Sequence, residues 1–87
     1  MELLAREGKS HGLSENVARQ LAVQTGIGAG LLACRSPFSP AELRKQVTSK
    51  GGTTEAALKV FEREGFSMIV SKGLRAALRR GRELSRT

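Results

Sequence analysis

The sequence predicts an all-α protein of four or five helices. Three observations support this prediction. Apolar residues recur every three or four positions along most of the chain, which is the period of a helix. No segment alternates apolar and polar residues with the period of two that a half-buried strand requires. Serine, proline and glycine stand at positions where helices typically begin and end.

The first two expected helices differ in how clearly their ends are marked. Residues 1–9 have a helical pattern without an N-cap signal, so we expect a helix whose beginning is truncated, with Gly8 as the left-handed residue after its end. Ser14 is the expected N-cap of a long second helix that continues to about Cys34. Glu15 follows in the first turn, where a negative charge is favourable.

Three glycines inside the long second helix need an explanation, because each costs about 1 kcal/mol relative to alanine. They are Gly26, Gly28 and Gly30. Either the helix breaks near Gly26, or the glycines allow another helix to approach closely. We favour close approach, because alanines extend the same small-residue surface. The run lacks the preceding strand and the G-x-G-x-x-G spacing of a dinucleotide-binding turn.

The third helix has the clearest local start signal. Ser39 is the expected N-cap, Pro40 occupies the first helical position, and Glu42 completes a capping box. The helix is expected to end near Val47 or Thr48.

The fourth and fifth helices are expected at residues 54–64 and 66–84, separated by a left-handed Gly65. The last helix has an apolar stripe and, opposite to it, a basic stripe. The apolar stripe contains Phe66, Ile69, Val70, Gly73, Leu74, Ala77, Gly81 and Leu84. The basic stripe contains Lys72, Arg75, Arg79, Arg82 and Arg86.

The stretch between the third and fourth helices, residues 47–54, is the candidate functional site. Gly51 and Gly52 permit a turn that includes positive φ, and Thr53 or Thr54 can act as the N-cap of the following helix. Backbone N–H groups and hydroxyls at such a helix start can bind a carboxylate or phosphate. The alternative is a simple helix–helix turn with a good cap, and the residues alone leave both interpretations open.

Composition narrows the class of protein. Eighty-seven residues make one small domain, and 39% apolar content with three Phe and no Trp or Tyr gives a weak core. Dimerisation would relieve that shortage.

One Cys and one His, Cys34 and His11, provide neither a disulfide nor a metal site. No apolar run approaches a membrane span and the first residues do not resemble a signal peptide, so we expect no membrane partner and a cytoplasmic location.

The net charge of +7 raises the alternative of a nucleic-acid-binding module. Most of this charge lies on the last expected helix. However, the chain has no Trp or Tyr for base stacking and no helix-turn-helix pattern. A charged stripe opposite an apolar one is typical of a solvated face, so no nucleic-acid partner is expected.

A resemblance to a known family adds to this interpretation. Residues 46–66, which read QVTSKGGTTEAALKVFEREGF, closely resemble the signature of pyrroline-5-carboxylate reductase. Residues 12–15, 22–29, 40–47 and 82–84 are similar to the flanking parts of that family in the same order. The resemblance therefore covers nearly the whole chain.

The resemblance implies an oxidoreductase that reduces 1-pyrroline-5-carboxylate to L-proline with NADPH or NADH. The family combines an N-terminal Rossmann domain with an interlocked helical dimerisation domain, similar to the C-terminal domain of 6-phosphogluconate dehydrogenase. Residues 1–87 correspond to the second domain only, with the first helix truncated and no Rossmann domain. The chain is therefore expected to form a homodimer or a higher oligomer, to lack a cofactor site, and to be inactive alone. A free-standing dimerisation module without catalysis remains an alternative.

The resemblance also assigns the site. The substrate carboxylate would be held by Ser49, Gly51, Gly52, Thr53 and Thr54. The Thr54 hydroxyl would lie near the ring nitrogen, which makes it the one candidate catalytic residue. The family usually has proline where Lys50 stands, so Lys50 either assists carboxylate binding or is solvated.

Overall fold

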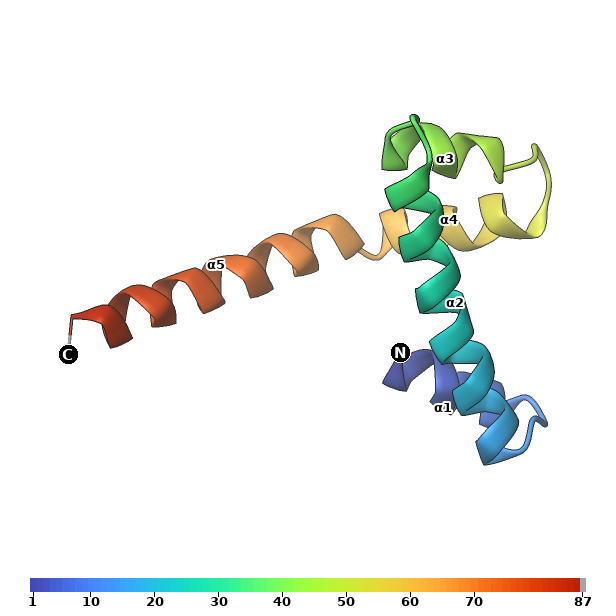
Figure 1. The fold of residues 1–87 in the computed structure, drawn as a ribbon, viewed down its shortest axis with the longest axis horizontal. Coiled ribbons are helices and arrows are strands. Elements are labelled where there is room, and N and C mark those ends of the chain that lie inside the picture. Colours follow the sequence, from blue (N-terminus) through green and yellow to red (C-terminus); the bar gives the residue numbers. More distant parts are fainter. Residues whose placement is uncertain (87) are drawn as a thin grey trace. The chain divides into compact units, whose positions relative to one another are not determined.

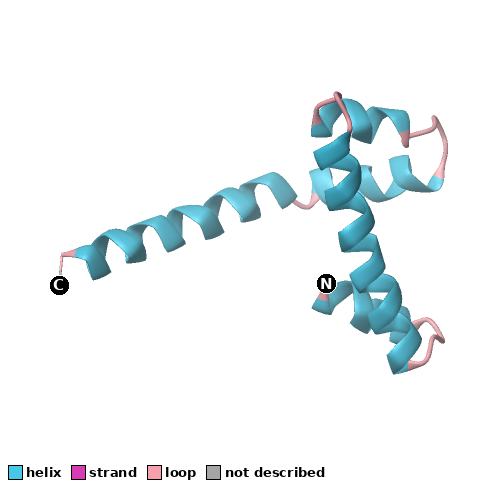
Figure 2. Cartoon of the chain, viewed as in Figure 1, coloured by secondary structure: helices cyan, strands magenta, loops and turns pink. Residues whose placement is uncertain are grey.

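The computed structural model describes residues 1–86, and that part of the chain contains five helices and no strand (Figure 1). Figure 2 shows that the helices are joined by short loops. The prediction of an all-α fold is confirmed. The chain divides into two units, Met1–Arg44 and a second that begins at Lys45, and each is described here by itself.

The first unit is built on a pair of helices, α1 (Glu2–Ser10) and α2 (Glu15–Arg35). α1 packs back against the first part of α2 (Figure 1). Ser14 caps α2 as predicted, because its Oγ accepts the Val17 N–H at 3.2 Å. Gly12, with φ of 104°, makes the turn between the two helices possible.

Gly8 does not end α1, and that prediction is wrong. It lies inside the helix, where a Cβ added to it would come within 3.2 Å of the Ala18 Cβ on α2. The glycine is therefore needed where the two helices approach each other. Ala18 and Ala22 are the buried apolar residues among those described, at 3% and 5% exposure.

α2 continues through its glycine run without a break, so the prediction of one long helix is confirmed. A Cβ at Gly26 would lie 3.0 Å from the Cε atom of Met1, whereas Gly28 and Gly30 face open space. The neighbour of Gly26 is the end of a flexible side chain, so close approach of a helix within this unit accounts for none of the three glycines.

α3 (Pro40–Gln46) begins with the predicted capping box. The Ser39 N–H donates to Glu42 Oε1 at 3.1 Å, and the Glu42 N–H donates to Ser39 Oγ at 3.2 Å. The Ser39 N–H, followed by the Ser39 hydroxyl, lowers the pKa of Glu42.

The second unit contains α4 (Thr53–Arg63) and α5 (Phe66–Ser85). Gly65, with φ of 81°, is the predicted left-handed residue between them. The rings of Phe61 and Phe66 pack across this turn with their centroids 5.6 Å apart. Beyond this turn the apolar stripe of α5 stays exposed, with Ile69 at 66% and Leu74 at 67%.

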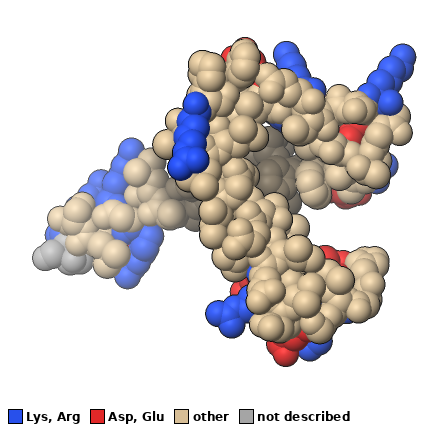
Figure 3. Space-filling model, turned by 45° about the vertical axis from the view of Figure 1, so that its right-hand side comes forward, with Lys and Arg blue, Asp and Glu red and all other residues tan. Residues whose placement is uncertain are grey.

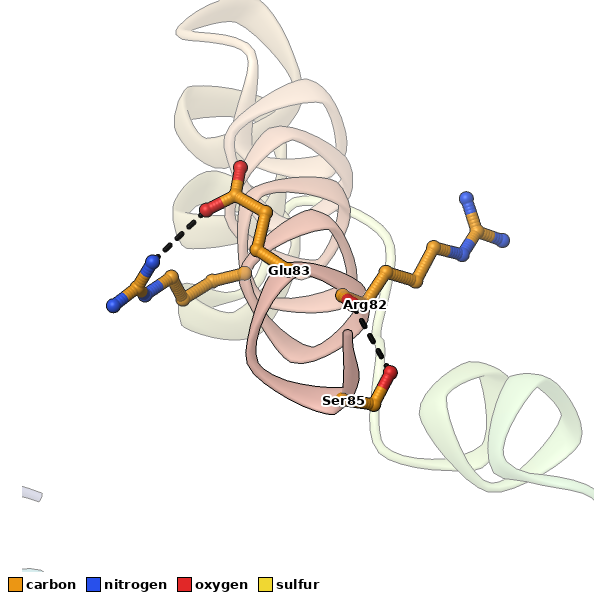
Figure 4. A network of polar contacts seen from close by, with 4 residues as sticks. Arg82, Glu83 and Ser85 are labelled. Atoms are coloured by element: carbon orange, nitrogen blue, oxygen red, sulfur yellow. Dashed lines mark hydrogen bonds and ion pairs between the residues drawn. The ribbon is translucent and has the colours of Figure 1, made fainter. Parts of the chain in front are cut away.

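The basic face of α5 is only partly neutralised. Lys and Arg side chains project along the helix in Figure 3. Near its end, Arg80 Nη1 lies 3.0 Å from Glu83 Oε2, while Ser85 Oγ donates to the Arg82 carbonyl at 3.0 Å (Figure 4). The Arg82 guanidinium points away from Glu83 in that view and has no partner among the described residues.

The chain lacks a core that matches its apolar content. It exposes 7722 Å², whereas two compact proteins of half its mass would together expose about 6,000 Å². Large apolar side chains on every helix except α3 are exposed. Exposed apolar surface of this extent is typical of interaction surfaces.

Candidate functional site

The loop between α3 and α4 forms a tight turn at Ser49–Gly52. The Gly52 N–H donates to the Ser49 carbonyl at 2.9 Å, with Lys50 and Gly51 in the central positions. Gly51 has φ of 75°. The third residue of a type II turn requires a positive φ, which favours glycine at that position. Lys50 occupies the second position, where proline is also compatible.

Gly52 is favoured for a different reason. A Cβ added to it would lie 3.2 Å from the Ser49 carbonyl oxygen and 3.3 Å from the Ser49 Cβ. A side chain at this position would therefore require Ser49 to shift by a few tenths of an ångström. The Gly-Gly pair thus combines one positive φ with one close backbone approach, which confirms the prediction of a glycine-dependent turn.

The N-cap of α4 is Gly52, so the prediction that Thr53 or Thr54 caps this helix is wrong. Gly52 has an extended conformation with φ of −88°, and its carbonyl accepts the Ala56 N–H at 3.2 Å. Thr53 is therefore the first helical residue and Thr54 the second. The physical reason is that the turn ends at Gly52, so the backbone is already helical at Thr53. A cap at Thr53 would require the helix to begin one residue later.

Glu55, which the sequence analysis did not single out, reaches back to the turn. The Gly51 N–H donates to Glu55 Oε1 at 3.1 Å, and Lys59 Nζ lies 3.3 Å from the same oxygen. The Gly51 N–H, followed by Lys59, lowers the pKa of the Glu55 carboxyl. The side chain of Glu55 is 28% exposed against 74% for Lys59. In the sequence, the four-residue spacing from Glu55 to Lys59 at the start of an expected helix could have indicated that these two side chains pair.

These contacts divide the backbone donors of the loop into two groups. The N–H groups of Gly51 and Gly52 are occupied by Glu55 and by Ser49. The N–H groups of Thr53, Thr54 and Glu55 belong to the first turn of an 11-residue helix and have no intrahelical acceptor. Within the described part of the chain, the loop contains a small set of free donors at the positive end of α4.

The hydroxyls of Ser49, Thr53 and Thr54 have no hydrogen-bond partner among the described residues. Ser49 and Thr53 are exposed, and Thr54 is half-buried. The arrangement can bind a small monoanion such as a carboxylate through hydroxyls and N–H groups. Lys50 is exposed and forms no ion pair with the described residues, so both interpretations of its side chain stay open.

Other classes of site have no support in residues 1–86. Three or more side chains able to hold a metal ion do not come together there. No helix of that part has both the length and the apolar character needed to cross a bilayer. The run from Gly26 to Gly30 lies in the middle of α2, where its N–H groups are used by the helix. It therefore does not form the phosphate-binding turn of a dinucleotide site.

Comparison with known proteins gives one consistent family. The family model described as pyrroline-5-carboxylate reductase dimerisation matches residues 1–84. The pyrroline-5-carboxylate reductase of Pseudomonas aeruginosa is 45% identical over 85 residues, which cover 98% of this chain and 31% of that protein. The enzyme of Pisum sativum is 41% identical over 85 residues, again 98% of this chain and 31% of that protein.

A solved structure agrees with the sequence relatives. Pyrroline carboxylate reductase of Plasmodium falciparum, crystallised with NADP bound, matches with a TM-score of 0.84 and 29% identity. The match covers 87% of this chain and 30% of that one. The chain thus spans about a third of the length of the relatives it matches. The chain, whose described part has five helices and a turn at Ser49–Gly52, is therefore a member of the pyrroline-5-carboxylate reductase dimerisation family.

Proposed function

We propose that this chain is the C-terminal helical domain of an enzyme that reduces 1-pyrroline-5-carboxylate to L-proline in proline biosynthesis. NADPH or NADH is bound by a separate N-terminal domain, and the enzyme works in the cytoplasm. The family match over residues 1–84 and the names of the relatives support this proposal. The single observation in the molecule that carries it is the set of free hydroxyls and N–H groups at Ser49, Thr53 and Thr54.

The loop would act on the substrate by orientation and hydrogen bonding. The substrate carboxylate is held by the Ser49 hydroxyl and by the N–H groups of Thr53 and Thr54, aided by the positive end of α4. The Thr54 hydroxyl lies beside the ring nitrogen, where it steadies the proton that the nitrogen carries in the product. Such orientation lowers the barrier because the imine carbon is held in one pose. Gly51 and Gly52 contribute shape, since their N–H groups are engaged within the loop.

The same proposal includes a homodimer in which the helices of two chains interlock. The exposed apolar stripe of α5 supports it, as does the shortage of buried residues. The alternative of a free-standing dimerisation module shares this feature and differs only in lacking catalysis. The experiment must therefore measure chemistry rather than association.

The decisive experiment uses a chimera in which this chain replaces the matching segment of the Pseudomonas aeruginosa enzyme. We expect Ser49→Ala and Thr54→Ala each to lower kcat/KM for pyrroline-5-carboxylate by about tenfold or more. The melting temperature should change little, since neither hydroxyl caps α4. Thr25→Ala is the matched control, because its hydroxyl is engaged by the Leu21 carbonyl in α2.

Two results would overturn the proposal. Normal kcat/KM in both variants would reduce the loop to a structural turn. A chimera that folds as a dimer and binds NADPH but does not turn over would favour the dimerisation module without catalysis.

A further inference from the structure

The turn that carries the proposed site is restrained by one carboxylate. Two consecutive glycines have many backbone conformations available, so the turn Ser49–Gly52 would be held more firmly by a second restraint beside its own hydrogen bond from Gly52 to Ser49. The hydrogen bond from the Gly51 N–H to Glu55 Oε1, 3.1 Å long, supplies it. It closes a short ring between the turn and the first turn of α4.

Lys59 makes this arrangement compatible with an anionic ligand. A carboxylate at the start of α4 would repel a second carboxylate bound to the neighbouring N–H groups. Lys59 Nζ lies 3.3 Å from Glu55 Oε1 and offsets that charge. The Gly51 contact and the Lys59 contact share one oxygen, so the side chain is held from both sides.

We infer that Glu55 is a positioning residue, whose carboxylate holds the turn Ser49–Gly52 in the shape that directs the substrate carboxylate to Thr53 and Thr54. The inference rests on the proposed function of this loop. By occupying the Gly51 N–H, Glu55 removes one donor that would otherwise compete for the substrate. It also fixes Ser49, whose carbonyl closes the turn through Gly52.

The test compares Glu55→Ala, Glu55→Gln and Glu62→Gln in the same chimera. Glu55→Ala removes the acceptor, whereas Glu55→Gln retains an oxygen for the Gly51 N–H. Glu62 is the matched control, because it lies on the same helix and its carboxylate has no partner among the described residues. Two readouts are measured: steady-state kinetics, and the amide resonance of Gly51 after selective ¹⁵N-glycine labelling.

We expect Glu55→Ala to raise KM for pyrroline-5-carboxylate by about tenfold, the effect of one charge-assisted hydrogen bond. The kcat and the KM for NADPH should be nearly unchanged, and the Gly51 amide resonance should shift upfield. Glu55→Gln should restore most of the KM, and Glu62→Gln should match the parent enzyme.

An unchanged KM in Glu55→Ala, or an equal rise in Glu62→Gln, would overturn the inference. So would a Gly51 resonance that does not move in Glu55→Ala. The two proposals fail differently. Normal kinetics in Ser49→Ala and Thr54→Ala contradict the proposed function, whereas defects there with a normal Glu55→Ala contradict only the positioning role.

Discussion

Two glutamates, Glu42 and Glu55, use their carboxylates in the same way on different helices. Each reaches back to a backbone N–H that lies before its helix, at Ser39 and at Gly51. In both cases the bound N–H is the main reason that the pKa of the carboxyl is lowered. Their surroundings differ, because Glu42 is also bonded to the Ser39 hydroxyl and Glu55 is paired with Lys59.

This chemistry predicts a pH dependence of stability. A folded-state pKa below the ordinary value of 4.5 means that the unfolded chain binds more protons near that pH. The contribution of Glu42 to stability is therefore present above about pH 4.5 and is lost as the pH falls through the lowered pKa. Glu42→Gln should reduce the loss of stability on acidification, measured by urea unfolding at several pH values. An unchanged acid dependence in that variant would contradict the role of the capping box.

At the scale of the element, α5 carries small and apolar residues beyond Phe66 that stay exposed in the described structure. A Cβ at Gly73 or Gly81 would have no neighbour within 4 Å. Glycine inside a helix costs about 1 kcal/mol relative to alanine, so two glycines without an internal contact are unfavourable in a lone chain. In the proposed dimer, a partner helix that approaches closely at Gly73 and Gly81 would explain them.

Gly73→Leu tests this explanation. Within one chain the new side chain meets open space and raises helix propensity, so helix content should be kept or increased. In the proposed dimer it would overpack the contact and weaken association by roughly 1–3 kcal/mol. Sedimentation equilibrium gives the dissociation constant. Arg79→Leu adds the same side chain on the basic face and should leave association unchanged, and equal effects of both variants would argue against a close helix crossing at Gly73.

At the scale of the whole molecule, the shortage of core is the dominant feature. Ala18 and Ala22 are buried, and both are small. Burial of one large apolar side chain contributes about 1.5–3 kcal/mol, so the proposed dimer would gain substantial stability by covering the exposed apolar residues. In that dimer we expect folding and association to be one process.

The isolated 87-residue chain should therefore associate without catalysing. We expect a dimer at protein concentrations of about tens of micromolar, with unfolding that depends on concentration. NADPH fluorescence should not change on addition of the chain, and pyrroline-5-carboxylate should not be reduced. A folded monomer at that concentration would contradict the proposed dimer, and measurable turnover would contradict the assignment of nucleotide binding to another domain.

The sequence by itself determined the helical class, the caps at Ser14 and Ser39, and the left-handed Gly65. Each depends on residues within about four positions, so local hydrogen bonding and backbone sterics decide it. Only the tertiary structure showed that Gly8 stays helical and lies where α1 closely approaches Ala18. It also decided that Gly52 rather than a threonine begins α4 and that Glu55 holds the turn. Several residues could cap α4, and which of them does so depends on where the turn places the backbone.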